Sequence, residues 1–229
     1  MKNVAFATSS AWPELTPDDR LAVEAFRARG MGVSPAVWSD PAVTWSAFDA
    51  IVIRSTWDYH RRFAEFDKWL TLLERVRCTV WNPCRLLRWN ANKRYLAELA
   101  ERGVPIVPTA WMPADGGPPL GEIMDANGWD DVVVKPTISA TAYGTRRVRR
   151  GDVGLKGGTG KGAIEAGELL VQPLVREIAT AGEWSVCVWV AKIQRMGPGA
   201  AASTASTCLA PRGPGSMTAH SLRSPTPTR

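Results

Sequence analysis

The N-terminal part of the chain alternates short apolar runs with amphipathic stretches, which is the pattern of a small α/β sheet. Residues 4–7, 32–38 and 50–53 are apolar runs of the length expected for buried parallel strands. Thr16 and Pro17 supply a capping residue and a proline at the first helical position, so a helix is predicted after the first strand. This strand–helix–strand order predicts an open α/β sheet.

The spacing of apolar residues also predicts which helix faces are buried. The first helix is expected to place Leu21, Ala25 and Ala28 on one face and to stop at Gly30. A second amphipathic helix is predicted from spacings of three and four residues among Phe63, Phe66, Trp69, Leu70 and Leu73.

The following part reads as a mixture of helices and strands. A helix is predicted over 92–102, ended by Gly103. Strands are predicted at 131–135, with 145–148 as a hairpin partner, and at 169–171 and 184–190.

The pattern breaks near residue 190. From residue 191 onward the chain contains no Asp, no Glu and no aromatic residue, so it is expected to be disordered. The predicted organisation is therefore an α/β protein with a small open α/β domain at 1–88, a mixed α/β domain at 89–190 and a disordered tail at 191–229.

Charge and cysteine usage exclude several classes of protein. The net charge of +6 is concentrated in the segment after residue 190, which carries five basic residues, so a basic nucleic-acid face is not expected. The four cysteines show no CxxC spacing, which argues against structural zinc and a disulfide framework. No apolar stretch approaches the ~20 residues that span a bilayer, and no signal peptide is recognisable, so a cytoplasmic protein is expected. The oligomeric state stays open.

Two lysines occupy positions suited to phosphate binding. Lys93 is expected in the first turn of the helix at 92–102, and Lys135 ends the apolar strand at 131–135. A lysine at a strand end keeps its stem in the core while its ammonium group can reach a phosphate. The alternative is a lysine that merely extends its ammonium group to solvent.

Small residues and a hinge follow these lysines. The run after Lys135 contains Ser139, Thr141 and Gly144, whose hydroxyls and backbone N–H groups could close over phosphates, although such runs are often plain turns. Further along, a strand ends in the manner of a hinge at Gln172, Pro173 and Leu174.

Two acids follow that hinge. The hinge backbone could pair with an adenine edge, and Glu177 could accept hydrogen bonds from ribose hydroxyls, with Glu183 as a further candidate. Both glutamates are read equally well as solvated loop acids.

In this order, the residues resemble the ATP-grasp superfamily. The block RSTWDY at 54–59, Asn82-Pro83 and the segment 88–96 are similar to the glutathione-synthetase-like members. Within them, the likeness is greatest to the group that contains the O-ureido-serine cyclo-ligase of cycloserine biosynthesis. The resemblance covers about residues 3–190.

The resemblance implies an ATP-grasp-like fold and ATP-dependent ligation with Mg²⁺, in which a small amino-acid-like carboxylate is activated as an acylphosphate. Lys93 and Lys135 would neutralise phosphate charge. The hinge would contact adenine and Glu177 the ribose. Arg54 and Asp58 are the candidates for the substrate side, although their block could instead serve only to pack the domain interface.

One departure from the family pattern concerns magnesium. Family members carry a late Asp and a Glu-x-Asn element that hold the metal, whereas no acid follows Glu183 here. Impaired catalysis is therefore expected, and a reading-frame slip near Val190 would explain the change in composition. The alternatives are a non-catalytic nucleotide-binding module and a non-functional fragment whose unfinished sheet exposes an edge.

Overall fold

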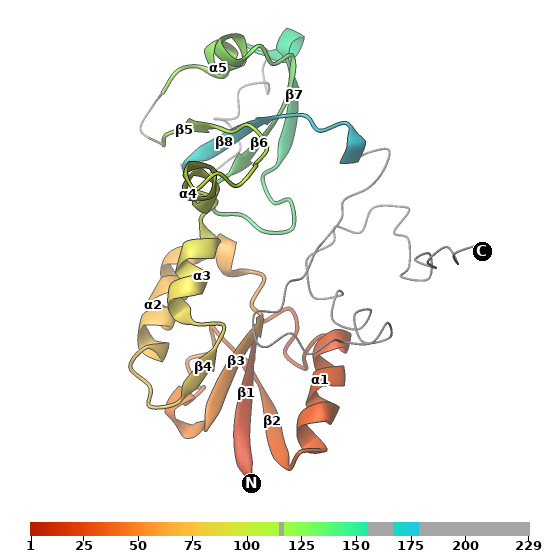
Figure 1. Ribbon diagram of the computed structural model, residues 1–229. Coiled ribbons are helices and arrows are strands. Elements are labelled where there is room, and N and C mark those ends of the chain that lie inside the picture. Colours follow the sequence, from red (N-terminus) through yellow and green to blue (C-terminus); the bar gives the residue numbers. More distant parts are fainter. Residues whose placement is uncertain (115–116, 155–166, 179–229) are drawn as a thin grey trace, which may run out of the picture. The chain divides into compact units, whose positions relative to one another are not determined.

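The computed structural model of the chain describes residues 1–114, 117–154 and 167–178 (Figure 1). The chain divides into two compact units, Met1–Val175 and Arg176–Arg229. The elements of the first unit, in chain order, are β1 (Lys2–Thr8), α1 (Pro17–Arg27), β2 (Met31–Val37), η1 (Trp45–Ala47), β3 (Ala50–Ser55), η2 (Tyr59–Arg61), α2 (Phe63–Leu73), β4 (Thr79–Trp81), α3 (Cys84–Ala91), α4 (Tyr95–Glu101), β5 (Ala110–Met112), α5 (Leu120–Asn127), β6 (Asp131–Pro136), β7 (Arg146–Arg149), η3 (Arg150–Asp152) and β8 (Leu169–Pro173). The predicted α/β class is confirmed.

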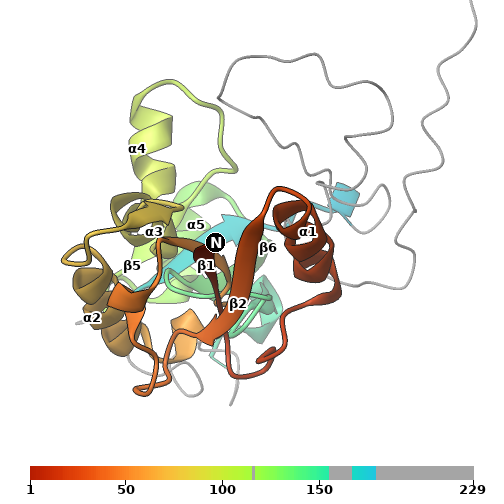
Figure 2. The same ribbon diagram turned by 90° about the horizontal axis from the view of Figure 1, so that it is seen from below.

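The N-terminal elements build a parallel sheet with strand order β2-β1-β3-β4. Alternate residues of β1 point to opposite faces, so Phe6 packs towards α1 while Ala5 and Ala7 join the core under α2. Figures 1 and 2 show α1 on one side of this sheet and α2 on the other. The three predicted strands are confirmed, whereas β4 is too short to leave a recognisable apolar run.

The buried face of α1 differs from the predicted one. Leu21 is 62% exposed, and the helix instead packs through Val23 and Phe26, whose ring meets Phe6 edge-on at 5.3 Å between centroids. The helix also buries Asp19 completely. Because an acid occupies part of the sheet-facing surface, the apolar spacing on which the prediction rested gave the wrong face.

The second sheet is antiparallel, with strand order β5-β8-β6-β7. The predicted hairpin of β6 and β7 is confirmed. One face of the sheet packs against Leu120, Ile123 and Met124 of α5. The elements α3, β5 and α5 were not predicted from the sequence, and the predicted strand at 184–190 and tail at 191–229 lie outside the described residues.

Among the helices in the described ranges, none has both the length and the apolarity needed to cross a membrane.

The packing of α2 leads to a prediction about stability. Leu70 is fully buried against the parallel sheet, so Leu70→Ala should lower the free energy of unfolding by about 2–5 kcal/mol through lost contacts and a cavity. Leu72, on the same helix, is 48% exposed, and Leu72→Ala should stay within about 0.5 kcal/mol of the parent. Urea denaturation followed by tryptophan fluorescence measures both. Equal losses for the two variants would contradict this packing.

Candidate functional site

One face of the antiparallel sheet is apolar and packs against α5, and the opposite face carries Lys135 and Gln172 beside apolar residues. In β6, Val132 and Val134 are buried beneath α5, so Lys135 points to the opposite face. The register pairs Lys135 with Leu170 and Val133 with Gln172, which places Gln172 on the same face as Lys135. We call this surface, defined by Lys135, Gln172 and Trp111 of β5, the polar face.

Lys93 lies in the linker between α3 and α4, so its predicted place in a first helical turn is wrong. The helix begins later because Asn92 is extended, and its side chain accepts a hydrogen bond from the backbone N–H of Arg94. The backbone N–H of Lys93 donates to the carbonyl of Thr137 at 2.8 Å. This bond fixes the linker to the segment that follows β6.

The ammonium group of Lys93 is held by neutral oxygens. Its Nζ donates to the carbonyl oxygen of Ser139 at 2.7 Å and to Ser139 Oγ at 2.9 Å. Burial is the main cause that lowers the pKa of Lys93 to about 8, and the charge of Lys135 is the second cause. Two cations are therefore close enough to repel each other in a partly buried setting, which a bound anion would relieve.

The loop after β6 adopts an unusual backbone. Thr141, Ala142 and Gly144 have φ values of 51°, 58° and 69°, in the left-handed region. For a β-branched residue such as Thr141 this conformation is strained, and such strain is concentrated at ligand-binding segments. Ser139 itself is 7% exposed, because it is enclosed by its bonds to Lys93 and to the carbonyl of Pro136.

Arg94 ties the linker to the sheet, and sequence reasoning missed it. Its guanidinium group pairs with Glu168 just before β8 and lies over the ring of Trp111 at 4.5 Å. Neither partner is near Arg94 in sequence, so no local pattern signals the contact. Gln172 is anchored in a similar way, since its Nε2 donates to Thr109 Oγ1 at 2.8 Å.

The predicted hinge residues belong to the end of β8. Gln172 and Pro173 lie in the strand, and the backbone N–H of Leu174 donates to the carbonyl of Asp131 at 2.9 Å. Any backbone contact from Leu174 to an adenine edge therefore requires its carbonyl. Glu177 is exposed and belongs to the second compact unit, and Glu183 lies outside the described residues.

The two predicted substrate-side residues stand in separate networks of the N-terminal sheet. Arg54 Nε donates to Asp19 Oδ1 at 2.7 Å. Asp58 Oδ1 accepts from the indole N–H of Trp38 at 2.7 Å, and Asp58 also pairs with Arg62 at 3.5 Å. The structure thus gives Asp58 a role in joining the end of β2 to the segment after β3.

Asp19 is a further residue that sequence reasoning missed. The sequence indicates only a favourable acid in the first turn of a helix, whereas the structure buries it to 1% exposure and bonds it to both Arg54 and Ser55. A buried charge of this kind cannot be read from a pattern of apolar residues.

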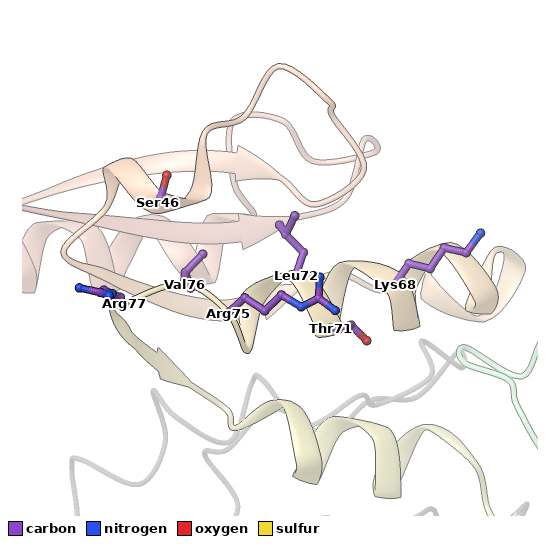
Figure 3. Close-up of a pocket in the computed structure, with 7 residues that line it drawn as sticks. All are labelled: Ser46, Lys68, Thr71, Leu72, Arg75, Val76 and Arg77. Atoms are coloured by element: carbon purple, nitrogen blue, oxygen red, sulfur yellow. The ribbon is translucent and has the colours of Figure 1, made fainter.

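The structure also contains a cavity of about 580 Å³ beside α2 (Figure 3). It is lined by Ser46, Lys68, Thr71, Leu72, Arg75, Val76 and Arg77, none of which is a predicted site residue. Figure 3 shows its basic side chains spread along the helix and the following segment without converging on one point, so it is not the candidate site.

Sequence comparison finds relatives for the N-terminal part. Residues 4–82 match the family described as "D-cycloserine synthetase DcsG, N-terminal domain". The chain is 37% identical over 134 residues to the "Cycloserine biosynthesis protein DcsG" of Streptomyces lavendulae, an alignment that covers 56% of this chain and 44% of that protein. The chain thus matches less than half the length of this curated relative.

Comparison with solved structures extends the likeness to the second sheet. The crystal structure of D-cycloserine synthetase DcsG superposes with a TM-score of 0.68 and 27% identity, covering 79% of this chain and 62% of that one. The RimK domain ATP-grasp protein of Sphaerobacter thermophilus, at 20% identity and a TM-score of 0.56, covers 76% of this chain and 64% of that one and shares the fold. The chain therefore has an ATP-grasp-like fold, and over part of its length it is similar to the cycloserine synthetases.

Proposed function

We propose that this chain binds ATP on the polar face of its antiparallel sheet, as part of a ligase that activates a small amino-acid-like carboxylate. The observation that carries the proposal is the pair of lysines, Lys93 and Lys135: burial of Lys93 and, after it, the charge of Lys135 lower the pKa of Lys93 to about 8. A polyphosphate is the ligand that best offsets such a cost, because it brings several negative charges to one place.

The surrounding residues supply the remaining contacts of this proposal. Ser139, Thr141 and Gly144 border the phosphates through the loop whose backbone is already left-handed at Thr141 and Gly144. Adenine is assigned to the end of β8, at Gln172, Pro173 and Leu174.

In the proposed reaction, an oxygen of the substrate carboxylate attacks the γ-phosphorus of ATP, and the bond from that phosphorus to the bridging oxygen of ADP breaks. An amine-type nucleophile then attacks the acylphosphate carbon and releases inorganic phosphate. Lys93 and Lys135 would hold the phosphate oxygens and stabilise the charge that develops during transfer. The substrate side is assigned to the N-terminal domain, at Arg54 and Asp58.

Magnesium fits the described residues poorly. Across residues 1–114, 117–154 and 167–178, no three His, Cys, Asp or Glu side chains gather as a metal site would require. The printed sequence also supplies no acid after Glu183. Magnesium prefers carboxylate oxygens, so we expect slow turnover from this chain alone.

The poor fit of magnesium to the described residues also favours a second candidate function, which is nucleotide binding without turnover. We also propose that the chain divides into domains at 1–88 and 89–190, followed by a tail at 191–229. The parallel sheet lies within the first domain and the antiparallel sheet within the second. Isothermal titration with ATP, followed by an assay of phosphate release with Mg²⁺ and O-ureido-serine, separates the candidates. Binding with turnover supports the ligase, binding alone supports the second candidate, and the absence of binding contradicts both.

The lysine pair yields a mutational prediction. Lys135→Met should weaken ATP binding about tenfold or more, because a charge-assisted contact to phosphate is lost. Lys68→Met, which removes a basic side chain from α2 outside the proposed site, is the matched control and should bind ATP like the parent. Titration calorimetry measures both, and a similar effect of the two variants would show that only overall charge matters.

The lowered pKa of Lys93 yields a prediction about pH. With a pKa of about 8, Lys93 of the free chain is mostly protonated at pH 7 and mostly deprotonated at pH 9. Bound phosphates favour the charged ammonium and raise this pKa, so ATP binding at pH 9 should take up a proton and weaken as the pH rises. Calorimetry in buffers of different ionisation enthalpy measures the uptake. Lys93→Met should abolish it, and an uptake that survives in this variant would assign the proton to another group.

A further inference from the structure

The edge of the parallel sheet at the carboxyl ends of β1 and β3 has the topology of a binding crevice. The strand order β2-β1-β3-β4 means that the chain leaves β1 towards one side and returns to the other side with β3. Ligands of open α/β sheets bind where the order reverses in this way, outside the carboxyl ends of the strands. The two strand ends are joined there by a hydrogen bond from the backbone N–H of Ser9 to the carbonyl of Ser55 at 3.0 Å.

Polar side chains are buried at this edge to an unusual degree. Asp19 is 1% exposed, and its two carboxylate oxygens accept from Arg54 Nε at 2.7 Å and from Ser55 Oγ at 2.5 Å. Its backbone N–H donates to Thr16 Oγ1, which fixes the first turn of α1. The carboxylate of Asp19 is thus held by one hydroxyl and by Nε of the guanidinium group, in the first turn of a helix, where a negative charge is favoured.

This arrangement fixes the orientation of Arg54. Asp19 accepts the hydrogen bond from Arg54 Nε. Within the described residues, no group accepts a hydrogen bond from the terminal amino groups of Arg54. The side chain of Arg54 is 24% exposed, so it is not closed off from solvent. A planar guanidinium held in one orientation presents paired N–H donors that match the two oxygens of a carboxylate.

We propose that Arg54 binds the carboxylate of the small amino-acid-like substrate and that Asp19 is the residue that positions it. The inference rests on the proposed function and gives that function a residue pair on its substrate side. A simpler alternative is that the Arg54–Asp19 pair only ties α1 to β3, in which case stability changes and ligand binding does not.

The test uses the full chain and O-ureido-serine as the probe, with the corresponding carboxamide as the control ligand. NMR titration should show binding of the carboxylate that falls about tenfold or more in Arg54→Gln and in Asp19→Asn. Ser55→Ala removes the other bond to Asp19 and leaves Arg54 in place, so it should lose stability without losing affinity. The carboxamide should be insensitive to all three changes.

A double variant separates positioning from stability. If Asp19 acts through Arg54, then adding Asp19→Asn to Arg54→Gln should cause no further loss of affinity. A further loss in that background, or equal losses in Asp19→Asn and Ser55→Ala, overturns the inference. Should Asp19→Asn fail to fold, Asp19→Glu keeps the charge but moves it and should also weaken binding of the carboxylate, whereas unchanged affinity overturns the positioning role.

Two further outcomes distinguish this inference from the proposed function. Binding of ATP without any binding of the carboxylate probe overturns the inference and leaves the nucleotide site standing. Preferential binding of inorganic phosphate that is lost in Arg54→Gln also overturns it, because the ligand would then be a phosphate.

Discussion

The arrangement of the polar face depends on how the Lys93 ammonium group is held. It is partly buried, bonded to two oxygens of Ser139 that carry no formal charge, and close to the charge of Lys135. Neutral oxygens replace some of the lost hydration but do not cancel the positive charge, which is why burial lowers the pKa of Lys93. The same bonds connect the linker before α4 to the loop after β6.

The N-terminal sheet also holds a buried charged side chain, and here the charge is negative. Asp19 is a buried acid, and it is tolerated because Arg54 and Ser55 both donate hydrogen bonds to its carboxylate. In both places a charged side chain is held by residues from distant parts of the sequence. Each network fixes the direction of a basic group towards one edge or face of a sheet.

The likeness to cycloserine synthetase fits the two-sheet organisation and extends beyond the residues of the N-terminal family match. It does not by itself say which residues act, since a fold carries many functions and the site must be argued from its own chemistry. The chain corresponds to less than two thirds of that solved structure. The nucleotide and carboxylate assignments therefore rest on Lys93, Lys135 and Arg54 in this chain.

Local sequence determined the strands β1, β2, β3, β6 and β8, the start of α1 at Thr16 and the buried face of α2, because apolar runs and capping residues act over a few positions. It also marked Lys93, Lys135 and Ser139 as candidates, and the resemblance to a known family added Arg54. Only the tertiary structure decided that Lys93 lies outside a helix and bonds to Ser139. It also showed that α1 turns Val23 and a charged Asp19 towards the sheet while Leu21 faces outward. These features depend on partners far away in sequence, whose desolvation and hydrogen bonds exist only once the chain has folded.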